Sequence, residues 1–224
     1  MSKIARMKIL SVAITVLTVL LIVSSAIALP ILIRPFYYLQ IEPLRLPQRT
    51  GLTFSDIKFA YDEMMDYCLG LRPDFSAGIL KYSEEGVSHF ADVRALFFAD
   101  FIIIGISSVA LIVIAIIIKK KRLTPYRFLG RSAPFWSVAS IGAICVLIGV
   151  SCAINFTETF IFFHKIFFIG KTNWSFKPSQ DPIIHLLPNE FFSNCAIFIF
   201  ATILIASIGI LLYEFFPRKT MNKK

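Results

Sequence analysis

Short motifs of the commonest soluble enzymes are missing from this sequence. It contains no HExxH, GxSxG, P-loop or GxGxxG pattern, so metalloprotease, serine hydrolase and NTPase chemistries are disfavoured. Its four cysteines form no CxxC pair and have no metal-ligand spacing with histidine, and Cys145 and Cys152 share one apolar stretch. We therefore expect Cys145 and Cys152 to be packing residues, and neither a disulfide framework nor a zinc site.

Charged residues and domain linkers are also scarce. Only 17% of the 224 residues are charged, 57% are hydrophobic and 23 are Phe, whereas about 45–50% of a soluble domain is apolar. This excess of apolar side chains predicts a protein embedded in lipid. Because no internal repeat, Gly/Ser-rich linker or low-complexity tract divides the chain, we expect residues 1–224 to form a single membrane domain.

Four apolar stretches are long enough to cross a bilayer. A helix needs about 20 apolar residues for a hydrocarbon core of roughly 30 Å, because every backbone N–H and C=O must be bonded within the segment. The predicted fold class is an all-α polytopic membrane protein, a four-helix transmembrane bundle with an extracytoplasmic cap. The four spans are expected at about residues 9–33, 97–118, 133–156 and 191–216.

The basic residues predict the direction in which the chain crosses the membrane. Although the net charge is +9, the cations form three short clusters beside apolar stretches rather than a basic face, so no nucleic acid is expected as a partner. Lys and Arg accumulate in cytoplasmic flanks, and four crossings place all three clusters on one side. Both termini and loop 119–132 are therefore predicted to be cytoplasmic, and segments 34–96 and 157–190 extracytoplasmic. The clusters are Lys3, Arg6 and Lys8; Lys119, Lys120, Lys121, Arg122, Arg127 and Arg131; and Arg218, Lys219, Lys223 and Lys224.

The N-terminal apolar stretch has a second interpretation. Ala26-Ile27-Ala28 has the small-x-small form of a signal-peptidase site after a basic start. An apolar run of about 25 residues, however, exceeds the 7–15 residues typical of a signal peptide. We therefore interpret this stretch as an uncleaved membrane anchor.

The first extracytoplasmic segment predicts a cap of mixed secondary structure. Its proline-rich start, 34–47, indicates extended chain at the membrane surface. From Ser55 onward apolar residues recur at intervals of three and four, which predicts an amphipathic helix capped by Ser55 and stopped by Gly70. Residues 79–82 resemble a short strand and 84–86 a turn, so the cap is expected to contain a few short strands.

The first histidine of interest follows this turn. Ser88 is the expected N-cap of the helix that continues into the second span, which places His89 in its first turn and Asp92 three residues later on the same face. A helix N-terminus favours neutral imidazole, the form that a general base requires. The alternative is a surface histidine that pairs with Asp92 or caps the helix.

The second histidine of interest lies among phenylalanines at 160–168. An imidazole at the lipid boundary is costly unless it is used or paired, so His164 is a functional candidate, with a packing role as the alternative. His185 is flanked by apolar residues and is interpreted as packing or interfacial. Asp181, before a proline, is expected in a turn or cap, and Glu190 as a cap of the fourth span or a partner of an imidazole.

Five motifs near the two histidines are specific enough to indicate a relationship. They are Ser88-His89-Phe90-Ala91-Asp92-Val93, Phe163-His164-Lys165-Ile166-Phe167-Phe168, Trp174-Ser175-Phe176, Asp181-Pro182-Ile183-Ile184 and Leu187-Pro188-Asn189-Glu190-Phe191-Phe192. With these motifs and its four spans, the chain resembles a bacterial family of small membrane proteins that includes the lipoprotein intramolecular transacylase, Lit. The likeness covers the whole topology.

The resemblance implies an acyltransferase. Such an enzyme moves one acyl chain from the diacylglyceryl group of a lipoprotein's N-terminal cysteine to the α-amine of the same cysteine, which yields a lyso-form lipoprotein. The implied partners are a diacylated lipoprotein and membrane lipids, the implied cofactor is none, and the oligomeric state is left open. The family's two essential histidines match His89 and His164 by motif position.

Chemistry at this pair follows from what an ester-to-amide transfer needs, which is a neutral amine, a stabilised oxyanion and a protonated leaving group. We assign base character to His164 and acid or oxyanion-stabilising character to His89, with reversed roles or a transient acyl-imidazole as alternatives. The competing function is a non-enzymatic membrane protein that binds lipid or a partner at the outer face. The supporting residues expected are Asp92 to orient His89, Lys165 or Arg94 at the oxyanion, Trp174 in the pocket wall, and Asp181.

Overall fold

A computed structural model describes residues 2–216, so the basic cluster expected at residues 218–224 lies outside the described residues. The chain forms two compact units, which are treated separately below. The first unit comprises residues 1–26, 102–147 and 200–224, and the second comprises residues 27–101 and 148–199.

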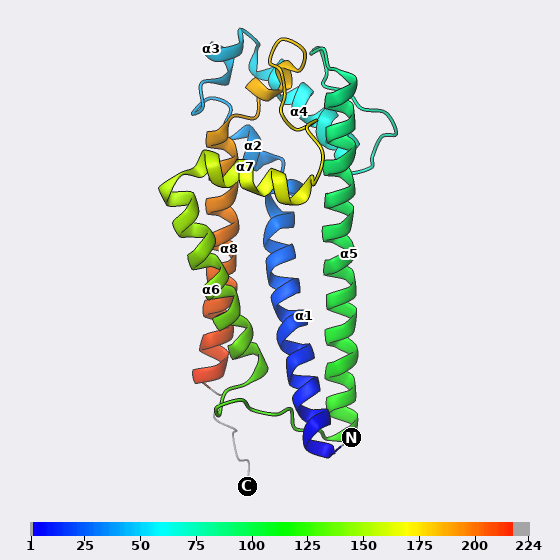
Figure 1. Ribbon diagram of the computed structural model, residues 1–224, viewed down its shortest axis with the longest axis vertical. Helices are drawn as coiled ribbons and strands as arrows, with labels where there is room; N and C mark the ends of the chain where they lie inside the picture. The colour runs from blue at the N-terminus through cyan, green and yellow to red at the C-terminus, as the bar shows by residue number, and fades with distance from the viewer. Residues whose placement is uncertain (1, 217–224) are drawn as a thin grey trace. The chain divides into compact units, whose positions relative to one another are not determined.

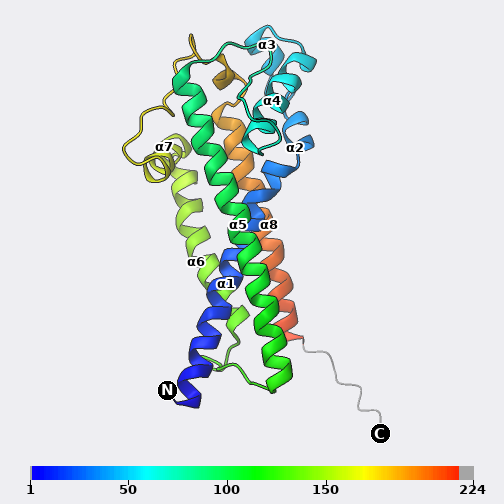
Figure 2. The same cartoon turned by 90° about the vertical axis from the view of Figure 1, so that its right-hand side faces the viewer.

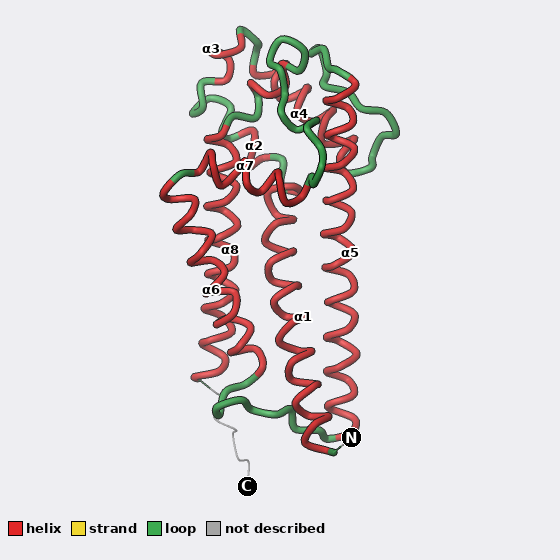
Figure 3. The backbone as a smooth tube through the Cα atoms, viewed as in Figure 1, coloured by secondary structure: helices red, strands yellow, loops and turns green. Residues whose placement is uncertain are grey.

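The described part of the chain is helical, and Figure 3 shows helices joined by loops with no strand in residues 2–216. Four helices are long and apolar enough to cross a membrane, which confirms the predicted all-α class with four spans. The chain is therefore a multi-pass membrane protein. These four helices, labelled in Figures 1 and 2, are α1 (Lys3–Leu32), α5 (Glu84–Lys121), α6 (Ala133–Ile154) and α8 (Asn189–Phe215).

Small hydroxyl side chains hold the first unit together. Ser11 Oγ donates to the carbonyl of Tyr126 over 2.8 Å, and Ser137 Oγ donates to the carbonyl of Thr15 over 3.2 Å. Ser11 and Ser137 are fully buried, and small residues of this kind let helix backbones approach closely where both surfaces are as apolar as lipid. This unit is thus packed by α1 against α6 and the loop before it, with hydroxyls bonded to backbone oxygens.

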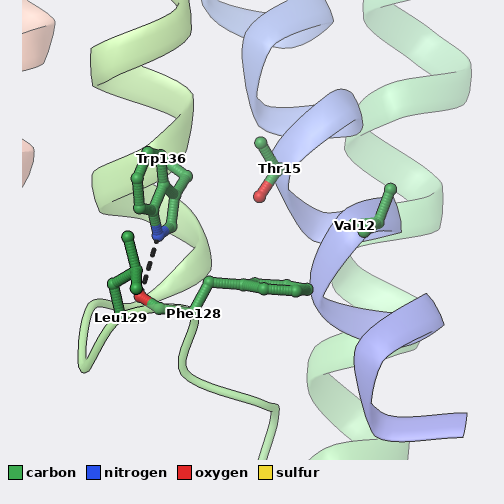
Figure 4. Close-up of a pocket in the computed structure, with 5 residues that line it drawn as sticks. All are labelled: Val12, Thr15, Phe128, Leu129 and Trp136. Atoms are coloured by element: carbon green, nitrogen blue, oxygen red, sulfur yellow. Dashed lines mark hydrogen bonds between the residues drawn. The ribbon is translucent and has the colours of Figure 1, made fainter. Parts of the chain in front are cut away.

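An open, apolar hollow lies in the first unit (Figure 4). Trp136 forms part of its wall and donates its Nε1–H to the carbonyl of Phe128 over 3.1 Å. None of its lining side chains can act as an acid or base, so it does not qualify as a reaction site. The lining residues are Val12, Thr15, Phe128, Leu129 and Trp136.

The second unit has an aromatic core. Tyr37 and Tyr61 stack with ring centroids 3.7 Å apart, and the hydroxyl of Tyr37 donates to the carbonyl of Leu186 over 2.9 Å. Phe191 packs edge-on against Tyr37, with a centroid distance of 5.2 Å. This core gathers α2 (Pro35–Tyr38), α3 (Leu46–Thr50), α4 (Phe54–Cys68) and the 3-10 helix η1 (Pro182–His185). The unit also contains α7 (Phe156–Phe167).

Residues 34–47 are not extended as predicted, and the reason is the position of their prolines. Pro35 and Pro47 lie in the first turns of α2 and α3, where the missing N–H is harmless and the fixed φ suits a helix. The N-cap of α4 is Thr53, two residues before the predicted Ser55, because Thr53 and Asp56 form a capping box. Its predicted stop at Gly70 is confirmed, since Gly70 takes up φ +74° just after the helix.

The predicted strand at residues 79–82 is wrong, and so is the turn at residues 84–86. Residues 79–82 have no described strand to pair with, and the chain there is anchored instead by the buried side chains of Phe75 and Ala77. Helix α5 begins at Glu84 rather than after Ser88. Ser83 Oγ, just before the helix, accepts a hydrogen bond from the backbone N–H of Gly86 over 3.0 Å, as an N-cap does, so the capping serine lies five residues before the predicted Ser88.

Helix α7 is a separate element rather than a continuation of α6. Asn155 separates the two helices, and its side chain accepts a hydrogen bond from the backbone N–H of Glu158 over 3.1 Å, as an N-cap does. Its buried side chain is His164, whereas Phe162 and Phe167 are exposed.

Candidate active site

The second unit brings together the two histidines that the sequence singles out. His89 lies on α5 and His164 on α7, and their ring centroids are 6.1 Å apart with the ring planes inclined by 30°. Both side chains are buried, at 6% and 9% exposure. Two imidazoles at this separation can engage neighbouring atoms of one reacting group.

Aromatic rings enclose the histidine pair. Phe168 and Phe176 lie 4.9 and 5.2 Å from His89 between ring centroids. Phe160 and Trp174 lie 4.2 and 5.2 Å from His164. The environment is therefore apolar and excludes most water, which strengthens any hydrogen bond made inside it.

The backbone determines which nitrogen of His164 carries a proton. Nδ1 lies 2.8 Å from the carbonyl oxygen of Phe160, and a carbonyl can only accept. In neutral His164 the hydrogen is therefore on Nδ1, and Nε2 holds the free lone pair. Burial lowers the pKa of His164, opposed by this backbone hydrogen bond, so the ring is neutral at physiological pH.

His89 lies in the second turn of α5 rather than in the first. This helix of 38 residues is about 57 Å long, against roughly 30 Å of hydrocarbon core, and His89 precedes its apolar stretch 101–118. Burial, followed by the neighbouring His164, lowers the pKa of His89 to about 4, although Asp92 acts in the opposite direction. His89 is thus neutral near pH 7, and within residues 2–216 its Nδ1 has no hydrogen-bond partner.

Asp92 lies on α5 one turn after His89 but pairs with the loop that follows α7. Lys171 Nζ donates to Asp92 Oδ1, and Asn173 Nδ2 donates to Asp92 Oδ2 over 3.0 Å and to Ser88 Oγ over 3.2 Å. Burial raises the pKa of Asp92, but these two partners outweigh it and lower the pKa overall. No hydrogen bond between Asp92 and His89 occurs in the described structure, so the predicted orienting role would have to act through space.

Asp181, at the far end of the same loop, holds Ser83, the residue just before α5. It accepts from the backbone N–H of Ser83 over 2.8 Å and from Ser83 Oγ over 2.7 Å. Gly86 lets this carboxylate approach, because a Cβ there would lie 2.3 Å from Asp181 Oδ1. Loop 168–181 is therefore fastened to α5 at both ends, and it carries rings that cover the two histidines.

Four other residues noted in the sequence lie away from the pair. Arg94 stacks over Tyr67 and donates to the carbonyl of Arg72, and Lys165 is exposed on α7. His185 is exposed, so a packing role does not fit it. Glu190 pairs with Arg49 at the start of α8 rather than with an imidazole.

Sequence reasoning missed part of the site. Phe160 and Phe168 flank His164 at i−4 and i+4, a helical spacing that could have identified them once α7 was recognised. Lys171 and Asn173 carried no such signal, because they reach Asp92 across a loop.

Fold and site together define a class: a four-span integral membrane protein with a buried, neutral histidine pair, and without a metal-binding cluster in residues 2–216. The model of the family described as lipoprotein intramolecular transacylase Lit matches residues 12–192. The chain belongs to this family.

Solved structures with the same fold come from this family too. The membrane integral lipoprotein intramolecular transacylase Lit from Bacillus cereus superposes with a TM-score of 0.81 at 24% identity, covering 91% of each chain. Two further structures of that protein, with one histidine replaced by alanine or by arginine, give a TM-score of 0.75 at 23% identity. They cover 91% of this chain and 89% and 88% of their own. No curated protein matches the sequence.

Proposed function

We propose that this acyltransferase moves one acyl chain from the diacylglyceryl group of a lipoprotein's N-terminal cysteine to the α-amine of that cysteine, through His164 and His89. Membership of the transacylase family supports the acyl transfer. The observation that carries the residue assignment is the buried pair of neutral imidazoles 6.1 Å apart.

His164 is the general base in this proposal. Its Nε2 lone pair takes a proton from the α-amine as the nitrogen attacks the ester carbonyl. The same nitrogen then returns that proton to the departing glycerol oxygen when the C–O bond breaks. One ester and one amine become one amide and one alcohol, so the net reaction needs no cofactor.

His89 stabilises the oxyanion of the tetrahedral intermediate. An imidazole with a pKa of about 4 does not carry the extra proton of a general acid near pH 7, whereas neutral imidazole still has one N–H to donate. Its unpartnered Nδ1 is available to the substrate. Of the two roles that the sequence suggested for His89, general acid and hydrogen-bond donor to the oxyanion, these observations favour the second.

The enclosing rings favour transfer over hydrolysis. Amine and ester belong to one molecule, and holding them in a reactive geometry can be worth roughly 7–11 kcal/mol. Phe168, Phe176 and Trp174 keep water from the pair, which protects the ester from competing attack. Trp174 is accordingly proposed as a wall of the pocket and Asp181 as the anchor of its covering loop.

The proposed orientation follows from the positive charges in the loop between α5 and α6. Lys119, Arg127 and Arg131 lie in this loop or beside it, and such clusters stay in the cytoplasm. Both termini are then cytoplasmic, while the histidine pair works at the extracytoplasmic face among membrane lipids. We treat both compact units as parts of one membrane domain.

Fragment-ion mass spectrometry of a reporter lipoprotein tests this function. The transfer leaves the parent mass unchanged, so the N-terminal fragments must be read, in a bacterial host without another N-acylating enzyme. Wild type should give an N-acyl cysteine fragment, and His164→Ala should give none at equal membrane abundance. His185→Ala, which removes an exposed histidine, is the matched control and should behave as wild type. A free amine with well-expressed wild type would point instead to a lipid-binding protein.

A further inference from the structure

A lipoprotein's α-amine poses a charge problem for the histidine pair. Its pKa is about 7.7–8.0, so at neutral pH it arrives mainly as an ammonium ion. The pair itself is neutral and enclosed by rings, and such surroundings do not compensate a hydrogen-bonding cation. A carboxylate close to the pair is therefore needed to receive the amine before it is deprotonated.

Asp92 is the carboxylate that meets this need. It lies on the same face of α5 as His89, one turn away, and is close enough to act on its charge. Asp181, the other carboxylate of this region, already accepts two hydrogen bonds from Ser83. Glu190 is engaged with Arg49.

An unsatisfied atom beside Asp92 indicates a missing donor group. Asn173 donates both of its described hydrogen bonds through Nδ2, which leaves a buried Oδ1 with no partner within residues 2–216. Buried acceptors without donors are costly, and an ammonium group supplies three donors.

Resting on the proposed function, we propose that Asp92 and Asn173 form the subsite for the substrate's α-ammonium group, with Lys171 as its occupant before substrate binds. Lys171 Nζ presents the same chemistry to Asp92 Oδ1 from a side chain that is 49% exposed. Replacing one ammonium by another conserves the charge at Asp92. Lys171 can move away when the substrate arrives, because about half of its side chain is already exposed.

A binding measurement separates this subsite from the chemistry. The probe is a lipopeptide whose two glycerol esters are replaced by ethers, so that no acyl chain can move. It is prepared with a free α-amine and with an N-acetylated amine, and both affinities are measured for the full-length protein in lipid nanodiscs. The ratio of the two affinities reports recognition of the ammonium group alone.

Replacement of Asp92 and replacement of Lys171 should then change this ratio in opposite directions. Asp92→Asn should lower the preference for the free amine by about tenfold, the scale of a hydrogen bond to a charged group. Lys171→Gln should raise it by about threefold, because a competitor is removed. Lys177→Gln removes another exposed positive charge from the same loop and should leave the ratio unchanged.

If the ion pair between Lys171 and Asp92 were purely structural, Lys171→Gln would not raise the preference for the free amine. An unchanged or lowered preference in Lys171→Gln, or a full preference in Asp92→Asn, would overturn the subsite. Binding of the N-acetylated probe shows that a variant is folded, and a misfolded variant cannot gain affinity. If wild type fails to transfer an acyl chain in the ester form of the lipopeptide, the proposed function fails. If wild type transfers the acyl chain but Asp92→Asn leaves the affinity ratio unchanged, only the subsite fails.

Discussion

The two units differ in what their buried polar groups can do. In the first unit, buried Ser11 and Ser137 bond to backbone oxygens, and such hydroxyls neither titrate near pH 7 nor lack partners. In the second unit, the polar groups are titratable, and all three histidines of the chain belong to it. A hydrogen-bonded hydroxyl stabilises the packing of helices. A buried imidazole with an unpartnered nitrogen lowers the stability of the fold but can still bond to a substrate. The comparison assigns a scaffold role to the first unit and chemistry to the second.

Removal of His89 should give the largest difference between the units. We expect His89→Ala to lower the initial rate of N-acylation about 10²–10³-fold, the effect of losing an oxyanion donor. His89→Gln keeps an N–H and should retain more activity. Rates are measured from the N-acyl cysteine fragment at equal protein abundance.

The matched variant for this experiment is Ser137→Ala, which also removes a buried polar group but in the first unit. It should retain a rate near that of wild type. A loss in Ser137→Ala as large as that in His89→Ala would break the assignment of chemistry to the second unit.

Gly86→Ala should have the next largest effect. Its Cβ would lie 2.3 Å from Asp181 Oδ1, so the cap of α5 and the covering loop must shift. Because misplacement of a site by about 1 Å can cost up to 10²-fold, we expect about a tenfold slower transfer and a lower melting temperature. Gly142→Ala in the first unit meets no atom within 4 Å and serves as the control, for which neither quantity should fall.

Acid should destabilise the second unit selectively. The pKa of His89 is about 4 in the folded protein against an ordinary value of 6.5. The unfolded chain therefore binds a proton that the folded chain does not, and stability falls as the pH drops from about 6.5 towards 4. At pH 5 we expect a loss of about 1–2 kcal/mol.

The two tryptophans report this difference, since Trp136 belongs to the first unit and Trp174 lies against His164 in the second. In single-tryptophan variants, the melting temperature reported by Trp174 fluorescence should fall as the pH drops below 6.5. The melting temperature reported by Trp136 should change little. His89→Gln should remove most of the pH dependence at Trp174. Equal pH dependence at both tryptophans would contradict the proposed origin.

The smallest effect is expected for Trp136→Phe. This change removes the hydrogen bond from Nε1 to the carbonyl of Phe128, which typically contributes about 0.5–1.5 kcal/mol. The melting temperature should fall slightly and the transfer rate should stay the same. A marked loss of activity at normal abundance would show that the apolar hollow of the first unit takes part in function.

Much of the architecture was accessible because local composition dictates it. Four helices follow from the cost of unpaired backbone groups in lipid, and α4 follows from its apolar spacing and from Gly70. The strand at residues 79–82 and the start of α5 were predicted wrongly. A strand needs another strand to pair with, and the described residues offer none to residues 79–82. At α5 two serines compete as the N-cap, and Ser83, whose hydroxyl accepts from the N–H of Gly86, is the one that the structure uses.

For the site, the sequence by itself singled out two groups: a histidine at the start of the helix before the second span, and another among phenylalanines, where an imidazole near lipid is costly unless it is used or paired. Only the tertiary structure decided that the two rings meet, that Phe160 directs the lone pair of His164 to Nε2, and that Lys171 reaches Asp92. Hydropathy and helical periodicity act over a few residues and can be read along the chain. Burial, tautomer and charge pairing depend on groups that only folding brings within a few ångströms, and these decide what the histidines can do.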